Sequence, residues 1–243
     1  MTPTMNTTTI TTLAPESLIG ELVAAHPVLA RHFEELGIDY CCGGKQALGA
    51  VCVARGLRAD LLIARLNVVI ARQTDPEEIN AATLSLTALA DHIEATHHVY
   101  LKNELPRLVE MAEKVAYKHG ERDARLQQVA ATTLELAEEM ICHMQKEEFI
   151  LFPLVRQIDT GAQGRMVAGI ADPIRQMEAE HEDAGAAIAR LRMLTDGFTP
   201  DADACNTHRA LLHGLAHFEV DLHRHVHKEN SILFPRALAR VAG

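Results

Sequence analysis

The stretch His143-Met-Gln-Lys-Glu147-Glu-Phe-Ile-Leu-Phe-Pro is repeated later in the chain as His225-Val-His-Lys-Glu229-Asn-Ser-Ile-Leu-Phe-Pro. Seven of the eleven aligned positions are identical, and position 225 lies 82 residues after position 143. Each copy has a His and a Glu four residues apart, which on an α-helix places both side chains on one face, about 6 Å apart along the axis. Helix bundles present ligands to metal ions in this way. The repeat therefore predicts two metal-binding helices.

A lone histidine precedes each copy at nearly the same distance. His98 lies 45 residues before His143, and His181 lies 44 residues before His225. The chain thus contains two similar halves, and each half supplies two helices. This predicts a four-helix bundle with an approximate two-fold relation, in which four histidines and two glutamates converge on the core. Such a set suits two first-row metal ions that the two carboxylates bridge. Imidazole and carboxylate ligands without a thiolate suit iron or manganese better than a structural zinc site.

Neighbouring histidines are alternatives to these ligands. His97 is the main rival to His98, because the two are adjacent and lie at almost the same level of the helix. His223 and His227 flank His225. Side chains two residues apart on an α-helix point about 160° away from each other. We therefore expect His223 and His227 on the surface if His225 faces the core.

Other polar residues near the ligands are candidates for supporting roles. His119 lies 21 residues after His98, which is about 31 Å along a continuous helix, so we leave it out of the ligand set. Glu148, Glu180 and Asp221 lie near ligands in the sequence. They are expected to orient histidine rings or relay protons, with an ordinary solvated position as the alternative.

The composition limits the class of protein. The chain has 243 residues, 48% of them hydrophobic, which is enough to bury a core in one large domain or two modest ones. Its formal net charge of -10 disfavours sequence-independent nucleic-acid binding. No run of 18 apolar residues occurs, so we expect no membrane span. Five cysteines, odd in number and unevenly spaced, argue against a disulfide framework and favour a reducing compartment.

Periodicity predicts an all-α chain in three parts. Residues 1–15 are rich in Thr and lack the features of a secretory signal, so we expect a disordered lead-in. Residues 16–72 are expected to form a small helical domain with a stop at Gly37 and a weak point at Gly56. Residues 78–241 are expected to form the bundle. Its first helix is predicted to start at Thr74-Asp-Pro-Glu-Glu and to end at Gly120. The other three are expected at about 122–158, 172–197 and 203–240.

The turn Cys41-Cys42-Gly43-Gly44 is a separate signal in the small domain. Adjacent cysteines do not easily form a disulfide with each other, and the two glycines favour a flexible, accessible turn. Thiolates there could bind a soft metal or take part in redox exchange. The alternative is that both cysteines are incidental buried residues.

These motifs together resemble the iron–sulfur cluster repair family, the di-iron "repair of iron centres" proteins. The resemblance rests on Ile38-Asp-Tyr-Cys-Cys-Gly-Gly-Lys-Gln, on the two His/Glu repeats, and on Ala179-Glu-His-Glu-Asp-Ala-Gly. The sequence Glu229-Asn-Ser-Ile-Leu-Phe-Pro-Arg-Ala-Leu adds to it. It covers about residues 16–241.

The resemblance implies a small N-terminal helical domain with the Cys pair and a hemerythrin-like bundle with two non-haem iron ions, bridged by oxygen or by carboxylates. Its ligand pattern falls on His98, His143, Glu147, His181, His225 and Glu229. A further histidine of the family falls on His119. The implied function is the repair, in the bacterial cytoplasm, of iron–sulfur clusters damaged by nitric oxide or oxidants.

In this interpretation Cys41 and Cys42 are the active thiols, which accept iron from the bundle and pass it to a damaged iron–sulfur protein. Nitric oxide or O2 would bind at the irons. Two alternatives stay open: an enzyme that reduces nitric oxide, and a hemerythrin-like protein that binds O2 or nitric oxide reversibly. A bundle without metal is a third. A homodimer, in which the small domain faces the bundle of a second subunit, stays open beside a monomer.

Overall fold

The computed structural model of this protein describes residues 13–71, 79–162 and 164–242. Within these ranges the regular elements are helices without a β-strand, and an isolated antiparallel bridge joins Leu18 and Ala47. The all-α fold predicted from the sequence is therefore confirmed. The chain divides into two compact units, Met1–Ala82 and Thr83–Gly243. No helix in the described ranges is long and apolar enough to cross a membrane.

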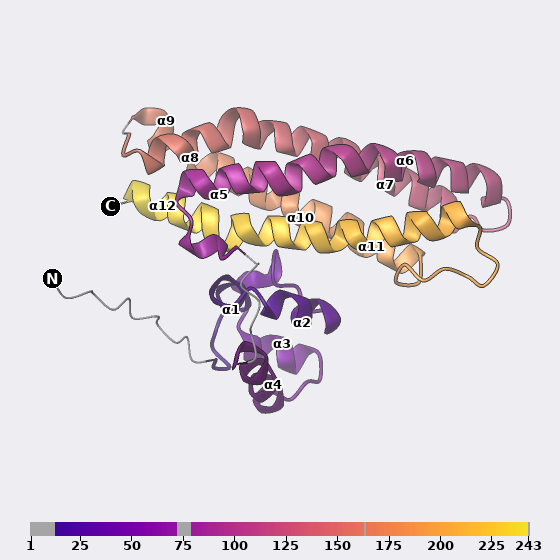
Figure 1. Cartoon of the computed structure of the whole chain (residues 1–243), viewed down its shortest axis with the longest axis horizontal. Helices are drawn as coiled ribbons and strands as arrows, with labels where there is room; N and C mark the ends of the chain where they lie inside the picture. Colours follow the sequence, from indigo (N-terminus) through magenta and orange to yellow (C-terminus); the bar gives the residue numbers. More distant parts are fainter. Residues whose placement is uncertain (1–12, 72–78, 163, 243) are drawn as a thin grey trace. The chain divides into compact units, whose positions relative to one another are not determined.

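Short helices make up the first unit (Figure 1). They are α1 (Ile19–Ala25), α2 (Leu29–Glu35), α3 (Leu48–Ala54) and α4 (Ala59–Ala71). Gly37 follows α2 with a φ of +63°, and Gly56 separates α3 from α4 with a φ of +65°. Glycine adopts such left-handed angles at little cost, which explains the predicted stop and the predicted weak point.

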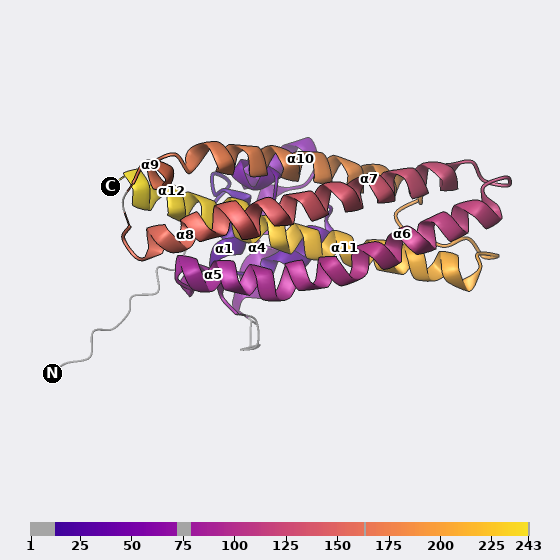
Figure 2. The same ribbon diagram turned by 90° about the horizontal axis from the view of Figure 1, so that it is seen from above.

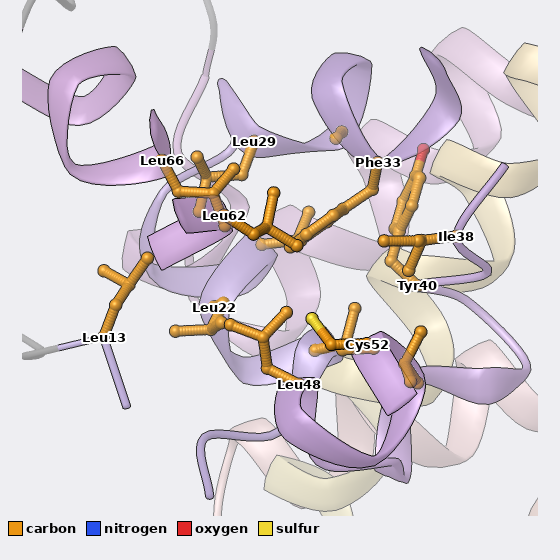
Figure 3. Packing of buried hydrophobic residues seen from close by; sticks show 14 residues of the cluster. Leu13, Leu22, Leu29, Phe33, Ile38, Tyr40, Leu48, Cys52, Leu62 and Leu66 are labelled. Atoms are coloured by element: carbon orange, nitrogen blue, oxygen red, sulfur yellow. The ribbon is translucent and has the colours of Figure 1, made fainter. Parts of the chain in front are cut away.

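Aliphatic and aromatic side chains fill the core of the first unit. Figure 3 shows Leu22, Phe33, Leu48 and Leu66, all fully buried, packed against one another. Leu13 belongs to the same cluster and is only 6% exposed. The ordered chain therefore includes residues 13–15, contrary to the lead-in expected up to residue 15. Residues 1–12 of that expected lead-in lie outside the described residues.

The two faces of α4 provide a test of this core. Leu66 is 0% exposed and Leu61 is 61% exposed on the same helix. Leu66→Ala should lower the free energy of unfolding of the first unit by about 2–5 kcal/mol, because it removes buried methyl groups and leaves a cavity. Urea denaturation followed by circular dichroism measures this loss. Leu61→Ala is the matched control, and an equal loss in both variants would contradict the packing described.

Four long helical rods lie side by side in the second unit (Figures 1 and 2). Their helices are α5 (Leu86–Ile93), α6 (Val99–His119), α7 (Arg125–Lys146), α8 (Phe152–Asp159), α10 (Ala171–Leu194), α11 (Asn206–His227) and α12 (Phe234–Ala242), with the short α9 (Arg165–Ala168) between two rods. Helices α5 and α6 form the first rod, α7 and α8 the second, α10 the third, and α11 and α12 the fourth. Helix α6 packs on α7 and α11, and α7 packs on α10. This is the predicted four-helix bundle.

Three of the rods contain a π-helical turn, which the sequence did not predict. These turns are Glu94–His98, Glu147–Leu151 and Lys228–Leu233. A π-helical turn is a rare interruption of an α-helix and is frequent at functional sites. Each of the three contains one or more of the predicted ligands, so the predicted continuous helices are broken at the level of the candidate metal centre.

The first rod begins later than predicted. Residues 74–78, where the helix start was expected, lie outside the described residues. Ala81–Thr83 forms a single 3₁₀ turn, and α5 begins at Leu86. The Ser85 hydroxyl accepts a hydrogen bond from the backbone N–H of Ala88 at 3.1 Å, and this capping bond defines the start. Gly120 ends α6, as predicted.

Candidate metal centre

Six side chains meet in the interior of the bundle. They are His98, His143, Glu147, His181, His225 and Glu229. They form two groups of donors, and within each group the ligand atoms lie within 4.8 Å of one another. One group joins His98 and His225 to both glutamates, and the other joins His143 and His181 to the same two glutamates. All six are buried. The structure therefore brings together all six residues that the repeat predicted as ligands.

Each glutamate lies between two imidazoles that present their Nε2 atoms. Glu147 Oε2 is 3.3 Å from Nε2 of His98 and 3.3 Å from Nε2 of His143. Glu229 lies 3.2 Å from Nε2 of His181 and 3.0 Å from Nε2 of His225. The Nε2 atoms of His143 and His181 are 3.1 Å apart. The nitrogen and oxygen atoms of each group are thus close enough to surround one ion.

The hydrogen bonding of Glu147 tests whether a cation fits this cluster. The side chain is 0% exposed, and neither carboxylate oxygen has a hydrogen-bond partner in the part of the chain that the structure describes. Burial of a carboxylate without compensation is very unfavourable. A positive ion between Glu147 and the imidazoles removes that penalty, and imidazole with carboxylate suits iron or manganese. The residues present therefore fit a bound metal.

The pKa values of the cluster show the same need for positive charge. Burial lowers the pKa of His143, but the charge of Glu147 and the contact with it, together with Glu229 and Glu180, outweigh burial and raise the pKa to about 9. Burial likewise opposes ionisation of Glu229, yet His225 and His181 hold the pKa of this carboxyl well below its usual range. A proton on His143 therefore offsets part of the carboxylate charge, and a metal ion that binds this ring must displace it.

Carboxylates orient two of the histidines from outside the cluster. The Nδ1 atom of His98 lies 2.8 Å from Oε1 of Glu148, and Nδ1 of His143 lies 2.9 Å from Oε2 of Glu180. Such contacts fix the ring and increase its basicity as a ligand. Glu148 and Glu180 therefore make the contacts that their predicted orienting roles require.

A third orienting residue was missed. His181 Nδ1 lies 2.9 Å from Oδ1 of Asn230. The repeat contains the signal that would have found it, because Asn230 aligns with Glu148 at the offset of 82 residues. Because Asn230 carries an amide and Glu148 a carboxylate, the sequence did not reveal that the two residues are equivalent.

Histidines outside the ligand set correct two expectations. His227 was expected on the surface, but it is only 5% exposed, and His97, the rival to His98, is equally buried. His97 Nδ1 lies 2.8 Å from Asp221, so Asp221 orients His97 and not a ligand. Successive residues on a helix point about 100° apart, so adjacent residues can both face the broad interior of a four-rod bundle. His119 ends α6 and belongs to neither donor group.

The first unit holds a separate cluster at the turn between α2 and α3. The Sγ atoms of Cys41 and Cys42 lie 4.0 Å apart, and Cys41 Sγ lies 3.1 Å from Oδ1 of Asp39. Asp39 also accepts hydrogen bonds from the backbone N–H groups of Cys41, Cys42 and Gly43. Cys41 is buried and Cys42 is half-buried. The contact with Cys42, together with burial, holds the pKa of Cys41 well above its ordinary value.

Known proteins match both units and nearly the whole chain. Residues 89–237 match the family described as the hemerythrin HHE cation binding domain, and residues 15–69 match a domain of unknown function (DUF542). The iron–sulfur cluster repair protein YtfE of Musicola paradisiaca is 41% identical over 92% of this chain and 96% of its own length. The YtfE protein of an Enterobacter species is 38% identical over 91% of this chain and 96% of its own length.

This chain belongs to the iron–sulfur cluster repair protein family. The resemblance inferred from the Cys-Cys-Gly-Gly turn and the His/Glu repeats is confirmed, as is the hemerythrin-like bundle. The family member described here has buried His and Glu clusters that can hold metal.

The orienting role of Glu180 leads to a prediction on metal affinity. Glu180→Ala removes the partner of His143 Nδ1 and should weaken binding of one ferrous ion by about 10–100-fold. Competition with a coloured chelator under anaerobic conditions measures this loss. Glu182→Ala, two residues along the same helix and exposed, is the control. Equal affinities in the two variants would show that Glu180 has no effect on the centre.

Proposed function

We propose that the bundle binds two iron ions that share both glutamates as bridging ligands. The proposed ligands are His98 and His225 for one ion and His143 and His181 for the other, with Glu147 and Glu229 common to both. The observation that carries the proposal is that Glu147 and Glu229 each belong to both donor groups. A carboxylate with two oxygens can contact two ions at once. When bound, the iron pair would supply redox-active ions to which nitric oxide or O2 binds.

We further propose that this protein repairs iron–sulfur clusters damaged by nitric oxide or oxidants, with damaged iron–sulfur proteins as its partners. Relatives that match over nine-tenths of the chain are named iron–sulfur cluster repair proteins, which supports this role. None of the five cysteines, all of which lie in the described ranges, forms a disulfide. Free thiols fit a reducing compartment, and we propose the cytoplasm.

The Cys-Cys turn is the proposed acceptor of the iron that is transferred. In a tetrahedral site with metal–sulfur bonds of about 2.3 Å, two sulfurs lie about 3.8 Å apart, close to the separation of Cys41 and Cys42. Asp39 offers a carboxylate oxygen to the same position. Each thiol would lose its proton as its sulfur–iron bond forms, and no electron has to move. A thiolate-bound ferrous ion can then exchange onto the cysteines of a damaged cluster.

Iron content and repair, measured on the same preparations, test this proposal. The parent chain should hold about two irons and should reactivate a damaged iron–sulfur enzyme. Glu147→Leu/Glu229→Leu should lose both iron and repair, because the bridging ligands are gone. Cys41→Ser/Cys42→Ser should keep its iron and lose repair. Cys142→Ser/Cys205→Ser, which replaces two exposed cysteines, is the matched control and should behave like the parent.

Each failure has its own meaning in this experiment. A parent chain that takes up no iron would discard the di-iron centre. Full repair by the Cys41→Ser/Cys42→Ser variant would discard the transfer through thiolates. Consumption of many nitric oxide molecules per chain, without loss of iron, would favour the nitric oxide-reducing enzyme over iron donation.

A further inference from the structure

The contacts that orient the histidines in one half of the bundle have counterparts in the other half, with one exception. Glu148 orients His98, and Asn230, its counterpart in the repeat, orients His181. These two contacts are therefore equivalent under the internal two-fold relation. The other two histidines, His143 and His225, should have equivalent partners as well, but they do not.

On one side a chain of polar contacts supports His143. Glu180 Oε2 lies 2.9 Å from His143 Nδ1, and the Glu180 carboxylate also accepts hydrogen bonds from Lys146 and Gln176. Lys146 thus fixes the Glu180 carboxylate, and this carboxylate orients the His143 ring. Glu180 is the residue that immediately precedes the ligand His181.

On the other side a histidine occupies the equivalent place. His97 immediately precedes the ligand His98, and Lys228, the repeat counterpart of Lys146, lies 2.9 Å from His97 Nε2. The other ring nitrogen of His97, Nδ1, forms a hydrogen bond with Asp221. The His97 ring stacks on the ring of His225, with centroids 5.3 Å apart and an angle of 5° between the planes.

A stacked ring does not replace an acceptor in the plane of the imidazole. The Nδ1–H bond of a metal-bound histidine lies in the ring plane, whereas His97 lies above the face of His225. Nδ1 of His225 is buried, and no described residue forms a hydrogen bond with it. His225 is therefore the one proposed ligand whose outer nitrogen lacks a hydrogen-bond partner in the described chain.

From this asymmetry we infer that the two iron positions are unequal, and that the ion at His98 and His225 is the one released to a damaged cluster. The inference rests on the proposed function. Both positions have one histidine oriented by a carboxylate. The difference is the second histidine, which Asn230 orients at one position and which lacks such a bond at the other. Loss of an orienting partner costs about 10–100-fold in metal affinity. Because a neutral amide is a weaker acceptor than a carboxylate, we expect the lower end of this range here.

Stepwise release by a chelator, followed anaerobically on the ferrous full-length chain, tests the inference. We expect two phases of equal amplitude, one iron each, with rates that differ by about tenfold. Asn230→Ala removes the partner of His181 and should accelerate the slow phase until the two phases merge. His97→Glu places a carboxylate where Glu180 stands in the other half and should slow the fast phase. Asp183→Ala, exposed on α10, is the control and should change neither phase.

Outcomes separate this inference from the proposed function. Two irons released in a single phase from the parent, or an Asn230→Ala variant in which only the fast phase accelerates, would overturn the inequality but leave the di-iron centre intact. A chain that holds no iron would instead overturn the proposed function. If His97→Glu does not fold, the Asn230→Ala result alone decides, because Asn230 is only half-buried.

Discussion

Two carboxylates buried in the middle of the bundle constrain everything around them. Glu147 and Glu229 are both fully buried, far from the water that normally stabilises their charge. Four imidazoles surround them, and the neighbouring carboxylates raise the pKa of one of these rings, His143, to about 9 despite its burial. The packing of the core and the binding of cations are therefore coupled. A ligand set that needs positive charge so strongly would be costly to retain in a bundle that never binds metal.

The backbone adapts to this cluster by local distortion of the rods. Glu147 opens one π-helical turn, Glu229 lies in another, and His98 closes the third. A π-helical turn adds a residue to one turn of the helix and so changes which side chains face inward. His181 is the ligand on the uninterrupted rod α10. The distortions thus occur at ligand positions on three rods, while the ends of the rods keep regular α-helical packing.

Much of this arrangement could be predicted from the sequence, because the repeat encodes position and chemistry together. His143, Glu147, His225 and Glu229 follow from their spacing, and the orienting role of Glu180 follows from its place beside a ligand. The π-helical turns could not be predicted, since the His-x-x-x-Glu spacing fits a regular α-helix equally well. The burial of His227 was missed for a related reason: a rod inside a bundle contacts neighbours over more of its circumference than the ligand-bearing face.

The chain combines two donor sets that would hold iron in different ways. The bundle uses nitrogen and oxygen donors fixed on rigid helices, whereas the turn at Asp39 offers two sulfurs and one carboxylate oxygen. Transfer toward cysteine-ligated clusters is favoured when iron passes from harder to softer donors, because ferrous iron binds thiolates well and the final ligands are themselves thiolates. A rigid bundle would retain both ions equally if all its ligands were equally supported. In the proposed centre, the stacked pair of His97 and His225 makes the two positions unequal, and release would begin at one of them without unfolding of the rods.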